Sequence, residues 1–96
     1  MKKILIVEDE TKLATLDGKP LDLTPVEFRL LGALASAPGR VFSRDKLLEQ
    51  LYADHRVVTD RTVDAHVKNL RRKLEDARPG TELVRSVYGV GYSLEL

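Results

Sequence analysis

Basic and amide side chains recur on one side of the segment formed by residues 61–74. At helical spacing, its apolar residues form a single stripe and its hydrogen-bond donors lie opposite. The stripe consists of Val63, Val67, Leu70 and Leu74, and the opposite side holds Arg61, Ala65, Lys68, Asn69 and Arg72. Guanidinium and ammonium groups donate to phosphate and guanine, and a carboxamide pairs with adenine. With the small Ala65 at the centre of this face, the segment predicts a helix that enters a DNA major groove.

Other polar residues of this segment are open to more than one interpretation. His66 borders the apolar stripe, so its position suits a structural role at least as well as contact with a base. Asp64 either orients the neighbouring cations or is simply a favourable charge in the first turns of the helix. Arg71 and Lys73 lie nearer the flanks, where we expect them to contact phosphate or solvent.

Composition restricts the class of protein. The 96 residues, without a long low-complexity segment, fit one compact domain spanning residues 1–96. The net charge is only +1, but residues 56–73 hold six Lys or Arg against two Asp and carry +4, which leaves −3 for the rest. The absence of cysteine excludes disulfides and thiolate metal sites, and no apolar run is long enough to span a membrane. We expect a soluble, cytoplasmic protein.

Catalytic and metal-binding patterns are absent from the sequence. The serines lack a recognisable partner base, and Ser43 is better explained as a helix cap. His55 and His66 have no third ligand at suitable spacing for zinc. Residues 89–91 (Gly-Val-Gly) are too short for a phosphate-binding loop and suit a turn. We therefore predict a protein that is not an enzyme and that needs no metal or cofactor.

Three helices are predicted from start and stop signals. Residues 24–27 read TPVE, in which threonine caps, proline suits the first helical position and glutamate completes a capping box. A Pro-Gly pair at residues 38–39 ends this helix. Ser43 caps a second helix, which places Leu47, Leu48 and Leu51 inward. The third helix begins after Thr59 or Asp60 and ends before a Pro-Gly pair at residues 79–80.

Short apolar segments flank the helices and predict two small sheets. The predicted strands are residues 4–7, 13–16 and 21–23 before the helices, and residues 83–87 and 92–96 after them. The first three read as an antiparallel meander, and the last two as a hairpin. The order predicts an α+β fold: a winged helix-turn-helix with an N-terminal antiparallel sheet, three helices and a C-terminal β-hairpin wing.

Four ordered motifs resemble the C-terminal effector domain of OmpR/PhoB-type bacterial response regulators, and within that family its BaeR-like branch. They are LTPVEFRLL at residues 23–31, VFSRDKLLEQLY at 41–52, DRTVDAHVKNLRRKLE at 60–75 and VRSVYGVGY at 84–92. The resemblance implies a transcription factor that binds double-stranded DNA sequence-specifically, often at tandem repeats. The alternative is a protein-interaction winged helix that contacts RNA polymerase or another regulator without reading DNA.

The resemblance also implies which residues form the contact surfaces. The DNA-contacting set is Arg61, Thr62, Asp64, Ala65, His66, Lys68, Asn69, Arg71 and Arg72, with Ser86 and Tyr88 on the wing; the polymerase-contacting loop is Asp54, His55 and Arg56. Many family members carry a basic residue where this chain has Tyr88 and Ser93. We therefore do not expect an arginine of the wing to enter the minor groove.

The first ten residues, MKKILIVEDE, resemble the opening strand and acidic pair of a receiver domain, whose body has no counterpart here. We favour the alternative that residues 4–7 form the first strand of the domain's own N-terminal sheet. Without a phospho-accepting aspartate, no phosphotransfer is expected. We expect a monomer or a weak dimer assembled on DNA, with a strand-exchanged dimer as the alternative.

Overall fold

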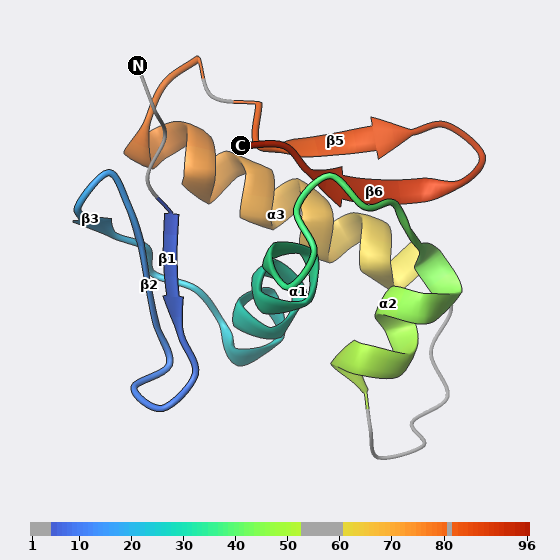
Figure 1. Ribbon diagram of the computed structural model, residues 1–96, viewed down its shortest axis with the longest axis horizontal. Helices are drawn as coiled ribbons and strands as arrows, with labels where there is room; N and C mark the ends of the chain where they lie inside the picture. Colours follow the sequence, from blue (N-terminus) through green and yellow to red (C-terminus); the bar gives the residue numbers. More distant parts are fainter. Residues whose placement is uncertain (1–4, 53–60, 81) are drawn as a thin grey trace.

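A computed structural model describes residues 5–52, 61–80 and 82–96 (Figure 1). Its elements are β1 (Leu5–Glu8), β2 (Leu13–Leu16), β3 (Lys19–Pro20), α1 (Pro25–Ala35), β4 (Phe42–Ser43), α2 (Arg44–Leu51), α3 (Arg61–Ala77), β5 (Val84–Val87) and β6 (Gly91–Leu94). The strands form two antiparallel sheets, with orders β1-β2-β3 and β4-β6-β5. The predicted α+β winged-helix fold is confirmed.

The third strand of the N-terminal sheet differs from the prediction. It was expected at residues 21–23, but β3 occupies Lys19–Pro20. Asp17 and Gly18 have φ angles of 51° and 82°, which are the positive values of a tight two-residue hairpin turn. This turn pairs Leu16 directly with Lys19, so the strand begins two residues earlier than hydrophobicity suggests.

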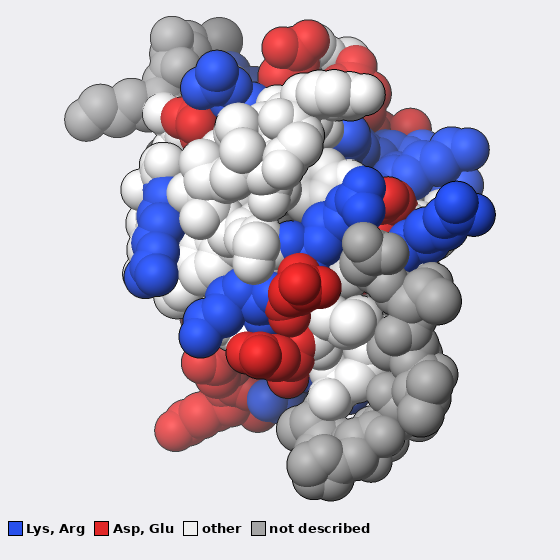
Figure 2. Space-filling model, turned by 90° about the vertical axis from the view of Figure 1, so that its right-hand side faces the viewer, with Lys and Arg blue, Asp and Glu red and all other residues white. Residues whose placement is uncertain are grey.

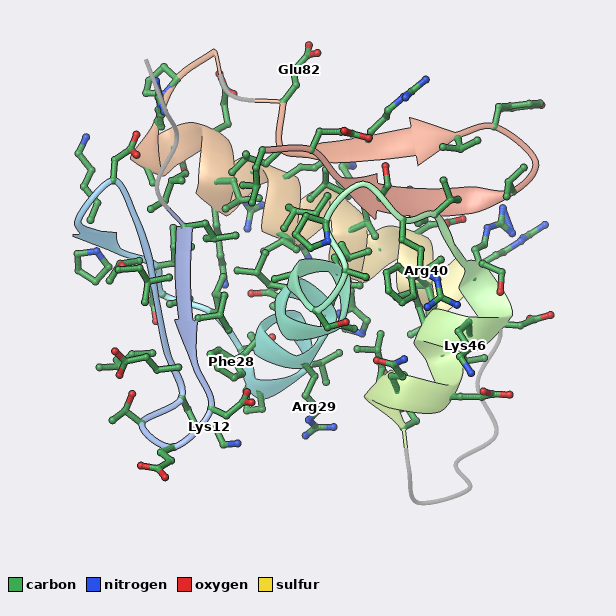
Figure 3. All side chains as sticks on the ribbon, in the orientation of Figure 1. Lys12, Phe28, Arg29, Arg40, Lys46 and Glu82 are labelled. Atoms are coloured by element: carbon green, nitrogen blue, oxygen red, sulfur yellow. The ribbon has the colours of Figure 1, made fainter. Side chains whose placement is uncertain are left out.

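Contacts at both ends attach the N-terminal sheet to the helices. At the β1–β2 turn, the Lys12 ammonium lies 5.8 Å from the centroid of the Phe28 ring of α1, and Figure 3 labels both side chains. At the β2–β3 turn, Asp17 forms a 2.8 Å ion pair with Arg78, which follows α3. Between them, the sheet packs Leu16 into the core.

Helix α1 occupies the centre of the molecule and contacts β1, α2, α3 and β6 (Figure 1). Its predicted capping box is present: the Thr24 hydroxyl accepts from the Glu27 amide at 3.2 Å, and the Glu27 carboxylate accepts from the Thr24 amide at 3.1 Å. The helix ends at Ala35, with Ser36 as its C-cap, before the predicted Pro-Gly stop.

Helix α2 is held at both ends. The Ser43 hydroxyl accepts from the Lys46 amide at 3.1 Å, which confirms the predicted cap. At the other end, the Arg29 guanidinium of α1 donates to the Leu51 carbonyl at 2.7 Å. Leu51 is buried, as is Leu47, whereas Leu48 is only half-buried.

One core joins both sheets to the three helices. Its fully buried side chains are Leu16, Leu30, Leu31, Leu34, Leu47, Leu51, Val63, Val67, Leu70, Leu74, Leu83 and Leu94. Burial of each is worth about 1.5–3 kcal/mol relative to exposure. The set includes the whole predicted stripe of α3, so the side of the helix opposite to this stripe faces outward.

Candidate nucleic-acid interface

The outward face of α3 carries the residues predicted to contact DNA. Arg61, Ala65, Lys68 and Arg72 are exposed, and Thr62 and Asn69 are half-buried beside them. Opposite them, the four residues of the apolar stripe are only 0–2% exposed, so this orientation of the helix is determined by the core. The predicted cap of α3 (Thr59 or Asp60) and the loop residues Asp54, His55 and Arg56 lie outside the described residues.

His66 is engaged within the protein. Its Nε2 atom and the Tyr52 hydroxyl lie 2.8 Å apart in a hydrogen bond, and the two ring centroids are 6.3 Å apart. Tyr52 follows α2, so this contact joins the end of α2 to the first turns of α3. The geometry favours the structural interpretation of His66 over contact with a base.

Lys73 forms a partly buried ion pair with Glu27, and the expectation that it contacts phosphate or solvent was wrong. Its ammonium group binds the carboxylate of Glu27, which is only 3% exposed. Burial raises the pKa of Glu27, but hydrogen bonds from Lys73 and the Thr24 amide, together with the charge of Lys73, lower it below its ordinary value of 4.5. Lys73 is therefore drawn toward α1, away from the outward face, because the buried carboxylate needs a countercharge.

The wing is the β5–β6 hairpin, with an uncharged tip at residues 86–91. Tyr88 at the tip is fully exposed, and Val90 beside it is exposed. At the end of β6 next to the turn, Gly91 and Tyr92 also pair with β4, which the sequence did not reveal. This pairing brings two backbones so close that a Cβ atom on Gly91 would lie 2.7 Å from the carbonyl carbon of Phe42. Glycine is therefore required at this position.

Polar contacts join α3 to the wing. The Tyr92 hydroxyl donates to Asp64 at 2.6 Å, and Asp64 also pairs with Arg44 of α2 at 3.3 Å. Burial raises the pKa of Tyr92 above its ordinary value of 10.0, and its hydrogen bond to Asp64 raises the pKa further. The phenol therefore keeps its proton and donates at neutral pH. The side chain of Asp64 thus contacts the wing, a partner that none of the predictions for this residue included.

Arg71 also contacts the wing. Its Nε and Nη2 atoms donate to the Val84 carbonyl at 3.1 and 3.0 Å, and Nη2 donates to the Ser86 hydroxyl at 2.5 Å. Its guanidinium carbon lies 5.6 Å from the centroid of the Tyr92 ring. The predicted contact set thus contains two groups of residues, one joined to the wing or to α2 and one facing outward.

Three cations remain on the outward face of α3. Within the described part of the chain, no hydrogen bond or ion pair engages Arg61, Lys68 or Arg72. Figure 2 shows the face that carries α2 and the tip of the wing, where Lys and Arg side chains lie on both sides and most densely at the upper right, and acidic side chains lie at the centre, the top and the lower left. The free cations on α3 surround a small residue, Ala65, which lets another surface approach the helix closely.

The described residues contain neither a metal-binding cluster nor a membrane-spanning helix. No group of three or more His, Cys, Asp or Glu side chains there could hold a metal ion. None of the helices in the same residues is both long and apolar enough to cross a membrane.

Most of the chain matches one known family of protein sequences. Residues 18–94 match the family described as "Transcriptional regulatory protein, C terminal". The chain is 57% identical over 91 residues to transcriptional regulatory protein BaeR of Escherichia coli O6:H1, a match that covers 95% of this chain and 38% of BaeR. It spans about two-fifths of the length of this and other curated relatives.

Solved structures show the same fold. The DNA-binding domain of the response regulator AdeR, in complex with an intercistronic region, superposes with a TM-score of 0.88 at 29% identity and covers 99% of this chain and 97% of that one. The DNA-binding domain of RstA from Klebsiella pneumoniae, in complex with the RstA box, gives a TM-score of 0.80 at 28% identity, with 99% and 98% covered.

Proposed function

The chain belongs to the family of C-terminal domains of transcriptional regulatory proteins, the OmpR/PhoB-type effector domains, and from this membership we propose that it binds double-stranded DNA sequence-specifically. Helix α3 enters the major groove, and the wing lies against the adjacent backbone or minor groove. The observation that carries the proposal is the outward face of α3, where Arg61, Lys68 and Arg72 surround Ala65 without partners among the described residues.

Affinity and specificity come from different residues of this face. Exposed Lys and Arg neutralise phosphates and release counterions, so binding weakens steeply as the salt concentration rises. Asn69 has the functional groups to pair with adenine, and Arg61 those to pair with guanine. On the wing, Tyr88 and Ser86 contribute contacts without charge.

The proposal includes the arrangement of copies on DNA. Two copies occupy tandem half-sites about 10 base pairs apart, which places both on the same side of the duplex. The free chain is a monomer. Sedimentation of the free chain as a stable dimer would contradict this part of the proposal and would point to strand exchange.

Binding to a duplex selected from a random pool, titrated at several salt concentrations, tests the proposed function. Arg61→Ala or Asn69→Ala should cost about 1–3 kcal/mol, with relaxed preference at one base position. Lys19→Ala, on β3 of the N-terminal sheet, is the charge-matched control and should leave affinity unchanged. A uniform loss across all sequences would assign Arg61 or Asn69 to phosphates instead.

The same titration separates DNA binding from the alternative function. If the folded chain bound no duplex in a salt-sensitive manner, the DNA-binding proposal would be wrong. The protein-interaction winged helix, with RNA polymerase or another regulator as its partner, would then be favoured.

A further inference from the structure

Asp64 and Arg71 lie seven residues apart on α3 and therefore on the same side of the helix. Both contact Tyr92 of the wing: Asp64 accepts from its hydroxyl at 2.6 Å, and the Arg71 guanidinium lies over its ring at 5.6 Å. We call these three residues the α3–wing clamp. One contact fixes the outer end of the tyrosine and the other its ring, so together they determine the direction of the strand that carries it.

Arg71 makes additional contacts with the other strand of the wing. Its Nε hydrogen and its Nη2 group are directed at the Val84 carbonyl and the Ser86 hydroxyl of β5. These two donors form a fork on β5, to which Val84 and Ser86 belong. Because the same guanidinium also lies over Tyr92 of β6, Arg71 contacts both strands of the hairpin. A planar guanidinium is suited to such a geometry, and a lysine ammonium is not.

The wing depends on such contacts for its placement. Its strands have four residues each, and a lone hairpin of this size is only marginally stable. Its pairing with β4 involves only Phe42 and Ser43. The tip at residues 86–91 is uncharged, so its contacts with a duplex depend on close fit rather than on long-range attraction.

We propose that Arg71 is a positioning residue, which places the wing on DNA through Val84, Ser86 and Tyr92 instead of neutralising a phosphate. This inference rests on the proposed function of the domain. It reassigns a residue that the sequence predicted to be a DNA contact. Lys68 and Arg72, which have no partner among the described residues, are then left to make the phosphate contacts of α3.

Salt dependence distinguishes the two roles of Arg71. Loss of a cation that neutralises a phosphate lowers the slope of log affinity against log salt by about 0.9. Loss of wing placement leaves this slope unchanged, because the tip that moves carries no charge. Arg71→Lys adds a second distinction, since lysine still neutralises a phosphate but cannot reproduce the fork.

The experiment measures the affinity for the selected duplex against salt concentration. Arg71→Lys and Arg71→Met should each weaken binding about tenfold with an unchanged slope, an effect typical of coupled contacts. Arg72→Met is the matched control: it removes an adjacent, exposed cation and should reduce the slope by about 0.9. Ser86→Ala, which removes only one exposed acceptor, should weaken binding less, again without a change in slope.

A double substitution tests whether Arg71 affects DNA binding by placing the tip of the wing. If Arg71 acts by placing the tip, adding Tyr88→Ala to Arg71→Met should cost less than the sum of the two single effects. Adding Tyr88→Ala to Arg72→Met should give additive effects. Full affinity of Arg71→Lys, a slope reduced by about 0.9 in Arg71→Met, or additivity with Tyr88→Ala would overturn the inference while leaving the proposed function intact.

A measurement on the free protein separates positioning from loss of folding. In Arg71→Met, backbone amides of Gly91–Leu94 should exchange with solvent faster, while the hydrogen-bonded amides within α1 keep their protection. Unchanged exchange in the wing would overturn the inference even if no duplex were bound, and failure of the wild-type chain to bind any duplex would overturn only the proposed function.

Discussion

The two three-stranded sheets of this domain are attached to its helices by different kinds of contact. The N-terminal sheet is held mainly by burial of Ala14 and Leu16, with two polar contacts at its turns. The C-terminal sheet also buries apolar residues, but hydrogen bonds attach it to α3: the Tyr92 hydroxyl donates to Asp64, and Arg71 donates to the Val84 carbonyl. Apolar burial is non-directional, whereas a hydrogen bond restricts distance and angle. The sheet with the directional contacts is the one whose tip extends beside α3.

The largest expected effect tests the N-terminal sheet. Leu16→Ala removes a fully buried side chain of β2 and should lower the free energy of unfolding by about 2–5 kcal/mol, measured by urea denaturation. The affinity of the remaining folded protein for DNA should not change, because the outward face of α3 is untouched. Leu13→Ala is the control, since Leu13 on the same strand is 56% exposed. If the folded fraction also lost affinity for DNA, the N-terminal sheet would influence the DNA-binding face, and the proposed difference between the two sheets would be wrong.

The next effect tests the C-terminal sheet. Gly91→Ala places a Cβ against the Phe42 backbone and should cost about 1–3 kcal/mol of stability as β4 and β6 separate. Unlike Leu16→Ala, it should also weaken DNA binding by the folded protein, because the wing is displaced. Val90→Ala, at the neighbouring exposed position, is the control for stability. A Gly91→Ala protein with wild-type stability and affinity would show that the close approach of β4 is dispensable.

The smallest expected effect concerns the ion pair between Glu27 of α1 and Lys73 of α3. Because this pair joins two helices of the core, it should stabilise the whole domain. Because the pKa of Glu27 is lowered on folding, its charged form stabilises the protein above pH 4.5, and this stabilisation is lost as the pH falls below that value. Glu27→Gln should cost about 1–2 kcal/mol at pH 7 and less in acid, measured by denaturation at each pH. Glu49→Gln, at an exposed site on α2, should show no such difference. A cost that is equal at pH 3 and pH 7 would contradict this account.

Features with local causes could be predicted from the sequence. The capping box at Thr24 and Glu27 depends on residues three apart, and the Ser43 cap on its own helix. The buried stripe of α3 follows from helical periodicity alone. Even the face of α3 expected to point outward is correctly placed, because burial of the stripe determines the orientation of the opposite side.

Features that depend on distant partners could not be predicted. Lys73 and Lys68 are the same residue type on the same helix, yet one pairs with a carboxylate 46 positions away and the other faces outward. Arg71 depends on a carbonyl 13 positions away. The start of β3 depends on the backbone angles of its turn rather than on hydrophobicity. In each case, residue type indicates what a side chain can bind but not which partner lies within reach.

The hydrogen bond from Arg29 to the Leu51 carbonyl couples parts of the chain that are distant in sequence. It closes the C-terminal end of α2 from another helix, while Tyr52 and His66 join the first residue after α2 to α3. A substitution of Arg29 or Tyr52 can therefore alter the placement of α2 or α3 without changing any residue on the outward face of α3.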